Sequence, residues 1–314
     1  MRYSRNKILV PVDFGEKSDQ IIEQSYSVAR VFDAEILLLY VIEDQAVISK
    51  FISPDEYLHW LKGHAQKQFD HIEDFVNRMN TKATTRISYI IKKGKVYDQI
   101  IETALDQDVI LIVMGCDAGE SKPIRRFVGT NTFNVVREAH CPVITLKGNE
   151  IFSAFRNILL PLDFTGQTKK QVQKAIEFGK FFGATIHLLS VVSAENKIKK
   201  LMKSVQMNQV RNAMASRGIN CTTEIIQDKT SSIPESICKM ASVKEADMII
   251  IMTQQKKNFA RFFVGSIAQE VIFRAGVPVL SISPKAEFRP QVVTSFIDPL
   301  GLMNPRQERD QDLV

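Results

Sequence analysis

Short apolar runs and amphipathic helical patterns alternate along the whole chain. Residues 8–12, 36–41 and 109–114 are runs rich in branched aliphatic side chains, which is typical of buried strands in a parallel sheet. This alternation of strand and helix favours βαβ units, with helices on both faces of the sheet. The first half is predicted to contain strands at 8–12, 36–41, 86–91, 109–114 and 143–146, and helices at 19–32, 54–79, 96–105 and from 130 to Pro142.

The same pattern occurs a second time. Pro11, Asp13 and the residues around them recur 150 positions later as Pro161 and Asp163, and residues 124–146 are echoed by residues 260–282. A self-similar period of this length indicates two tandem copies of one domain. The predicted organisation is a first domain, a second domain and a C-terminal tail, at residues 1–148, 154–285 and 286–314. In the second copy we expect helices at 198–210 and 233–241, and strands at 222–226, 248–252 and 279–282.

One stretch of the first copy has the features of an anion site. The strand at 109–114 leads into a loop with Gly115 and Gly119, and Gly129-Thr130 begins the next helix. Glycines let the backbone approach a bulky anion, Thr130 can cap the helix, and a helix N-terminus favours phosphate. The spacing is neither a P-loop nor the dinucleotide motif G-x-G-x-x-G. The alternative is that these are turn glycines followed by a helix cap.

Composition narrows the class of protein. The chain has 314 residues, of which 45% are hydrophobic and 24% charged, so two globular domains are expected. The net charge of +6 is spread over short basic clusters, so nucleic-acid binding is not expected. No apolar run has the length of a membrane span and no signal-peptide core is found, which predicts no membrane partner and a cytoplasmic protein.

Metal and redox chemistry are not predicted. The cysteines at 116, 141, 221 and 238 show no CxxC pairing, which fits reduced thiols. His59, His64 and His71 lack the spacing of a helical zinc pair. We therefore expect no protein-held metal, and Mg²⁺ only together with a nucleotide.

Four motifs of the first copy can be compared with known families: the opening ILVPVDF, the VMG at 113–115, the glycine loop and the CPV at 141–143. On these motifs, both copies resemble the universal stress protein family. Nucleotide-binding members show G-x2-G-x9-G-(S/T), and this chain is one residue longer in the first gap. The resemblance implies an α/β fold with two Rossmann-like domains of the adenine nucleotide alpha hydrolase type. Each would be a five-stranded parallel sheet of order 3-2-1-4-5 that binds ATP at the carboxyl ends of its strands.

The resemblance also implies a role for individual residues of the first copy. Asp13 would lie towards the base and ribose, and Val41 would offer backbone contacts to the adenine. Asp13 has an alternative role, which is to cap the turn that follows its strand. The implied nucleotide-binding residues are Pro11, Val12 and Asp13 at the adenosine, Val41 at the adenine, Met114 and Gly115 at the ribose, and Gly119, Gly129, Thr130 and Asn131 at the phosphates.

The second copy departs from this pattern. Thr253 is taken as the match of Gly115, and its loop has no glycine before Gly265-Ser266 and is two residues shorter. Side chains in place of glycines would crowd a phosphate. The second copy is therefore predicted to hold a degenerate site and to serve as a structural partner. Its site residues would be Pro161, Asp163, Val191, Gly265 and Ser266.

Three functions remain open. The first is a stress-response regulatory protein that binds ATP or another adenine nucleotide in the first copy. The second is a slow ATP hydrolase, although Asp117, Glu120 and Lys122 of the loop do not form a recognisable catalytic set. The third is an interaction scaffold that needs no nucleotide. In the family the last strand commonly pairs two domains, which implies an intramolecular pseudo-dimer and leaves a homodimer open.

Overall fold

The structure is a computed structural model, and it places the elements of two similar halves. It describes residues 6–13, 15, 17–43, 55–56, 59, 62–63, 66–67, 69–70, 85–116, 129–147, 154–164, 168–192, 197–227, 231–253, 266–283 and 285–287.

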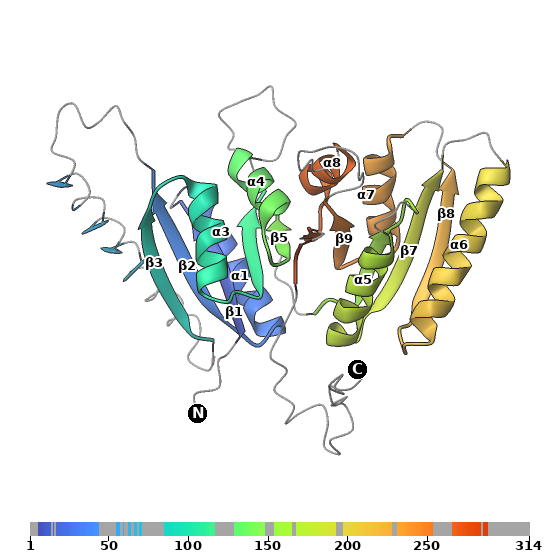
Figure 1. The fold of residues 1–314 in the computed structure, drawn as a ribbon, viewed down its shortest axis with the longest axis horizontal. Coiled ribbons are helices and arrows are strands. Elements are labelled where there is room, and N and C mark those ends of the chain that lie inside the picture. Colours follow the sequence, from blue (N-terminus) through green and yellow to red (C-terminus); the bar gives the residue numbers. More distant parts are fainter. Residues whose placement is uncertain are drawn as a thin grey trace, which may run out of the picture.

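The first half follows the predicted order of strands and helices (Figure 1). Its elements are β1 (Asn6–Val12), α1 (Ser18–Val31), β2 (Ala34–Ile42), β3 (Ile87–Lys93), α3 (Val96–Asp106), β4 (Leu111–Gly115), α4 (Thr130–Glu138) and β5 (Val143–Leu146). The described residues between 55 and 70 are helical, as predicted, and the remainder of the predicted helix at 54–79 lies outside the described residues.

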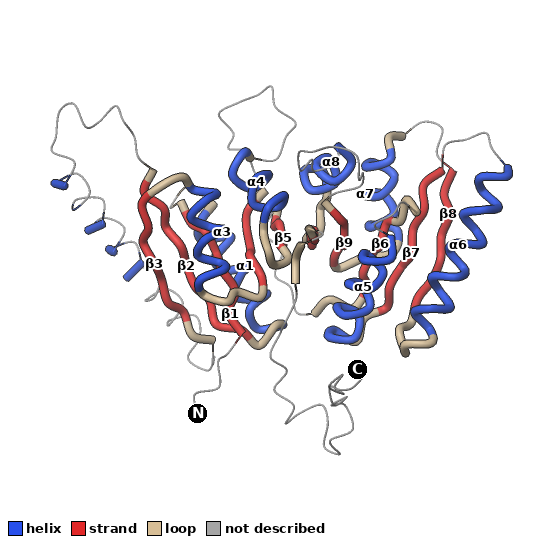
Figure 2. Tube along the Cα trace, viewed as in Figure 1, coloured by secondary structure: helices blue, strands red, loops and turns tan. Residues whose placement is uncertain are grey.

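The second half repeats this order (Figure 2). Its elements are β6 (Asn157–Pro161), α5 (Thr168–Phe182), β7 (Thr185–Val192), α6 (Lys197–Ala215), β8 (Cys221–Gln227), α7 (Ile233–Val243), β9 (Met248–Met252), α8 (Ser266–Arg274) and β10 (Val279–Ile282). The repeat extends to single backbone angles. Asp33 and Gly183 end the first helix of each half with φ of 46° and 62°, a left-handed turn that lets the next strand begin at once.

Within each half the sheet is parallel and has the predicted strand order. The order across the molecule is β3-β2-β1-β4-β5-β10-β9-β6-β7-β8, which is 3-2-1-4-5 in the first half and the same order reversed in the second. The tandem Rossmann-like fold is therefore confirmed. The two five-stranded sheets join at β5 and β10 into one continuous sheet of ten strands.

The junction between the halves is an antiparallel pair of the two last strands. Ile144 of β5 lies opposite Leu280 of β10, and both side chains are fully buried. Thr145 adds a hydrogen bond from its Oγ1 to the carbonyl oxygen of Val279, at 3.3 Å. Each strand thus covers the edge that the other would expose, and β3 and β8 form the outer edges of the sheet (Figure 1).

Two hydrophobic layers cover the two faces of the sheet, and both layers run through both halves. One layer joins the sheet to α1, α5 and α6, and the other joins it to α3, α4, α7 and α8. In the first layer, Phe32 from the end of α1 lies 5.4 Å from the ring of Phe181 and 5.2 Å from that of Phe182, both in α5. The halves therefore share a core as well as a sheet.

Among the described residues, we find no helix with the length and apolar character that crossing a membrane requires.

Candidate functional site

The candidate site of the first half lies where the strand order reverses. Strand β1 pairs with β2 on one side and with β4 on the other, so their carboxyl ends lie side by side. Open α/β sheets bind ligands at such a switch point. The strands bring Pro11, Val12, Val41 and Met114 to this edge, whereas Gly119 lies outside the described residues.

Asp13 follows β1 directly and is exposed. Its Oδ1 accepts a hydrogen bond from the backbone N–H of Gly15 and another from the hydroxyl of Ser18, each at 2.9 Å. The carboxylate therefore stabilises the turn into α1, which agrees with the structural alternative for this residue. The same bonds fix the carboxylate at the edge where a ligand would lie.

The end of β4 is tied to two helices. A Cβ added to Gly115 would lie 3.3 Å from Cδ1 of Ile21, so packing against α1 already favours a glycine there. On the other side, the hydroxyl of Thr132 donates a hydrogen bond to the carbonyl oxygen of Gly115, at 3.1 Å. This bond holds the N-terminus of α4 over the end of β4. Sequence reasoning missed Thr132, since the partner is known only once the helix is placed.

The N-terminus of α4 differs from the prediction in one respect. Gly129 is the N-cap, no side chain of a described residue caps the helix, and Thr130 is the first helical residue. The expectation that Thr130 caps the helix is therefore wrong, because a helical residue points its side chain away from the capping position. Thr130 and Asn131 are nevertheless the first two residues of α4. The side chain of Thr130 is exposed and that of Asn131 is half-buried.

Gly129 itself has a backbone conformation that any residue can adopt, with φ of −53°. No atom of the described residues lies within 4 Å of a Cβ added there. Neither backbone strain nor packing within the described part of the chain thus requires a glycine at this position. A glycine here leaves backbone N–H groups open to a ligand.

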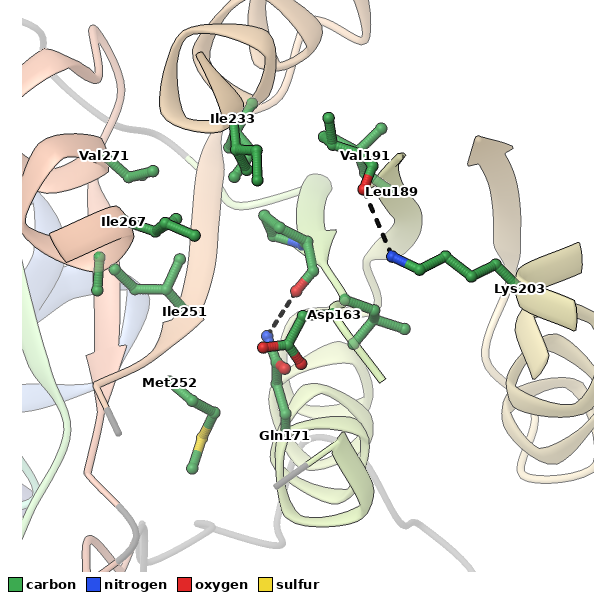
Figure 3. Close-up of a pocket in the computed structure, with 14 residues that line it drawn as sticks. Asp163, Gln171, Leu189, Val191, Lys203, Ile233, Ile251, Met252, Ile267 and Val271 are labelled. Carbon is green, nitrogen blue, oxygen red and sulfur yellow. Dashed lines mark hydrogen bonds between the residues drawn. The ribbon is translucent and has the colours of Figure 1, made fainter. Parts of the chain in front are cut away.

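A pocket in the second half lies at the corresponding edge, and its lining includes Pro161, Asp163 and Val191. Figure 3 shows Asp163 and Val191 among the labelled lining residues of this pocket. Its volume is about 140 Å³. Ser266 is exposed at the start of α8, and Gly265 lies outside the described residues. The other lining residues are Leu162, Gln171, Leu189, Lys203, Ile233, Ile237, Ile251, Met252, Ile267, Ala268 and Val271.

The register of the strands corrects one match between the halves. Gly115 pairs with Leu146 in β5, and the residue in the same place beside Ile282 of β10 is Met252. Thr253 corresponds instead to Cys116, since the backbone N–H groups of both bond to the carbonyl of the last residue of the neighbouring strand. The match of Thr253 with Gly115 is therefore wrong by one residue, and the loop up to Gly265 is one residue shorter than in the first half, not two. The second half has a methionine side chain where the first has none.

Lys203 and Gln171 line the pocket, and sequence reasoning missed both. Gln171 donates a hydrogen bond from Nε2 to the carbonyl oxygen of Pro161, at 2.8 Å. The Nζ of Lys203 reaches from α6 to β7, where it lies 3.3 Å from Oγ of Ser190 and 3.4 Å from the carbonyl oxygen of Val191. Burial lowers the pKa of Lys203, and the charge of Asp163 acts in the opposite direction.

All four cysteines are free thiols, and Cys116 and Cys141 are buried. Burial raises the pKa of Cys141 to about 12 and that of Cys238 to about 11. Because the thiolate is the reactive form, these two thiols are poor nucleophiles at neutral pH.

The fold and these two edges define a class of protein, a tandem α/β protein with candidate ligand sites at the strand ends of each half. The sequence pattern of the universal stress protein family matches residues 4–147 and again residues 154–283. The chain therefore belongs to the universal stress protein family, with two copies in tandem.

Individual relatives agree with this assignment. The chain is 29% identical over 140 residues to a universal stress protein of Methanothermobacter thermautotrophicus, which covers 44% of this chain and 92% of the relative. It is 26% identical over 147 residues to universal stress protein MJ0531 of Methanocaldococcus jannaschii, covering 45% of this chain and 81% of the relative.

A crystal structure of a universal stress protein from Archaeoglobus fulgidus has a similar fold over both halves. Its TM-score is 0.67 at 21% identity, with 88% of this chain and 96% of that chain covered. A putative universal stress protein from Pseudomonas aeruginosa gives a TM-score of 0.59 at 16% identity, covering 90% and 94%. At these identities the likeness concerns the fold.

Proposed function

We propose that the first half binds an adenine nucleotide, ATP accompanied by Mg²⁺, and that the chain acts as a regulatory protein in a stress response. The second half is its structural or interaction partner and does not hold the nucleotide. The proposal rests chiefly on one observation, the N-terminus of α4 at Gly129, which lies beside the switch point of the sheet and which no atom of the described residues covers.

The residues of the first half fit such a ligand. The carboxyl ends of β1 and β2 offer the backbone of Pro11, Val12 and Val41 to the adenosine. Asp13 adds an oriented carboxylate, which suits the hydroxyl groups of a ribose. Backbone N–H groups at Gly129, Thr130 and Asn131 would bind the phosphates, together with Gly119 of the loop.

The proposal also covers the domain limits, the location in the cell and the assembly of the chain. The domain limits are 1–148 and 154–285, with a tail from 286 to 314. The protein acts in the cytoplasm, without a nucleic-acid partner. Each chain is a pseudo-dimer of its two halves, and a homodimer would form through other surfaces than the paired strands β5 and β10.

Calorimetric titration of nucleotide-stripped protein with ATP and Mg²⁺ tests the nucleotide site. The wild type is expected to bind one equivalent. Gly129→Glu is expected to abolish binding, because the carboxylate occupies the phosphate position at a helix N-terminus. The substitution needs no backbone change, since φ at Gly129 is negative and no described atom obstructs a Cβ.

Two variants of the second half serve as controls. Gly265→Glu makes the corresponding change, and Gly276→Glu adds the same charge at another glycine whose Cβ position is open among the described residues. Both are expected to bind ATP as the wild type does. Absence of binding by the wild type would leave the nucleotide-independent scaffold, and loss of binding in Gly265→Glu would place a nucleotide in the second half.

A further inference from the structure

The pocket of the second half lies at strand ends that correspond to those of the nucleotide site proposed for the first half, but its lining has a different chemical character. Corresponding positions at the edge have lost small or polar groups. Gly115 becomes Met252, and the N-terminal turn of the helix has Ile267 and Ala268 where α4 has Asn131 and Thr132. All three replacements line the pocket. The side that would bind phosphates in the first half is apolar here.

Backbone acceptors at these strand ends are already bonded within the protein. Gln171 donates to the carbonyl of Pro161, and the hydroxyl of Ser190 donates to the carbonyl of Leu162 at 3.1 Å. Lys203 reaches the carbonyl of Val191, the residue that corresponds to Val41 of the first half. An adenine that bonded to this carbonyl would have to share it with the ammonium group. In the first half the residue corresponding to Gln171 is Ile21, whose side chain has no hydrogen-bond donor.

The ammonium group of Lys203 is a charged hydrogen-bond donor that the pocket offers to a ligand. An ammonium carries three N–H donors, and in the described part of the chain Nζ has two acceptors, each at more than 3.2 Å. Lys203 is half-buried at the pocket wall, whereas Asp163 is exposed and lies beside Gln171 (Figure 3). The positive charge is therefore less screened than the negative one.

We propose that this pocket is a second ligand site, which binds a small carboxylate with an apolar body and pairs its carboxylate with Lys203. The apolar side chains of Ile251, Ile267 and Val271 would contact the body of the ligand. A volume of about 140 Å³ suits a body of roughly the size of one aromatic ring, because a cavity of about 150 Å³ lined by similar side chains binds benzene. The site is separate from the nucleotide site of the first half.

Methyl NMR on the full chain labelled at the methionine methyl groups tests the proposal. Met252 lines this pocket and Met114 lies at the first site, so each half has its own reporter. Phenylacetate is expected to shift the Met252 resonance in a saturable way and to leave Met114 unchanged. Phenylacetamide has the same ring without the charge, and is expected to bind about tenfold more weakly.

Variants of two lysines on the same helix separate charge pairing from apolar contact. Lys203→Met keeps an apolar stem and is expected to lower the affinity for phenylacetate about tenfold, to that for phenylacetamide. Lys203→Arg retains the charge and is expected to retain most of the binding. Lys200→Met removes an exposed charge of the same helix and is expected to change nothing.

Three results would overturn the proposal. One is the absence of a saturable shift of Met252 with either phenylacetate or hexanoate. Another is equal affinity of wild type and Lys203→Met for phenylacetate, with the variant folded as judged by its unfolding midpoint. The third is a shift of Met252 by ATP with Mg²⁺ that phenylacetate reverses, since the pocket would then be a nucleotide site. Failure of ATP to shift Met114 would concern only the proposed function of the first half.

Discussion

Two serines at the end of β10 show how much a single hydroxyl group can contribute to stability. Ser281 and Ser283 are both buried. The hydroxyl of Ser283 donates to the carbonyl of Ala139 at 2.8 Å, whereas the hydroxyl of Ser281 has no hydrogen-bond partner among the described residues. Burial of a hydroxyl group removes its hydrogen bonds to water, which costs free energy. A hydrogen bond within the protein offsets that cost.

Removal of these hydroxyls is therefore expected to act in opposite directions. Ser281→Ala should leave the free energy of unfolding unchanged or raise it by about 1 kcal/mol, and Ser283→Ala should lower it by about 1 kcal/mol. Urea unfolding of both variants beside the wild type measures the difference. A Ser281→Ala variant less stable than Ser283→Ala would contradict this account.

His187 is expected to make stability depend on pH. Burial lowers its pKa from the ordinary value of 6.5, and the nearby Lys244 lowers it further. The unfolded chain therefore binds a proton more readily than the folded one, so stability is full above pH 6.5 and falls as the pH falls towards the folded pKa. Nδ1 of the His187 ring lies 2.9 Å from Oγ1 of Thr222.

The unfolding midpoint measured from pH 8 downward tests this expectation, with ~6.5 as the ordinary histidine pKa where the decline begins. His187→Gln has no titrating group at this position and should show a smaller decline between pH 6.5 and the onset of general acid unfolding. Parallel curves for the two proteins would show that His187 does not contribute.

At the scale of elements, the pairing of β5 with β10 decides how the halves assemble. Both strands are short, four residues each, and every residue in them is buried. Two such edges left open would expose unpaired N–H and C=O groups together with apolar side chains. Their antiparallel pairing removes both edges within one chain.

A disulfide can report on this pairing. Thr145 and Val279 lie directly opposite each other, so Thr145→Cys with Val279→Cys should form a disulfide under mild oxidation. It should raise the free energy of unfolding by about 2–4 kcal/mol, because it closes a long loop in the unfolded chain. Mass spectrometry and denaturant unfolding measure the two effects, with Thr145→Cys alone as the control. Six free thiols in the folded double variant, the four native ones and the two introduced ones, would contradict the register.

At the scale of the whole molecule, the two halves are expected to unfold together. The hydrophobic layers continue through both, and Phe32 links the end of α1 to Phe181 and Phe182 of α5. Phe155 precedes β6 and joins the same group of rings, at 5.1 Å from Phe182. The group of aromatic rings lies where the halves meet, so it couples their stabilities.

Phe32→Ala is therefore expected to cost about 3–5 kcal/mol and to separate the unfolding of the halves. Calorimetry should show one transition for the wild type and two, or a van't Hoff enthalpy well below the calorimetric one, for the variant. Phe69→Ala is the matched control, since Phe69 is equally buried but stacks on Tyr89 within the first half, at 4.4 Å. Separate transitions in Phe69→Ala as well would show that the aromatic group has no special role.

Most of the fold could be predicted because the strands are short apolar runs and the whole pattern is repeated. Details at the strand ends could not. The match of Gly115 with Thr253 was wrong by one residue because the loops of the two copies differ in length, and only the pairing with β5 and β10 fixes the register. The sequence pattern also predicts a cap at Thr130, but a hydroxyl one residue into the helix has no capping geometry.

The ligand site at the carboxyl ends of the strands stays a prediction. The sequence pattern was enough for the two tandem domains and, through the family resemblance, for their strand order. These follow from local periodicity and from repetition, which one chain displays directly. The structure was needed for the antiparallel register in which β5 pairs with β10, and for the contact that Lys203 of α6 makes with Val191. Both depend on how elements distant in the chain pack together. The pattern of neighbouring residues does not specify which distant side chains come into contact.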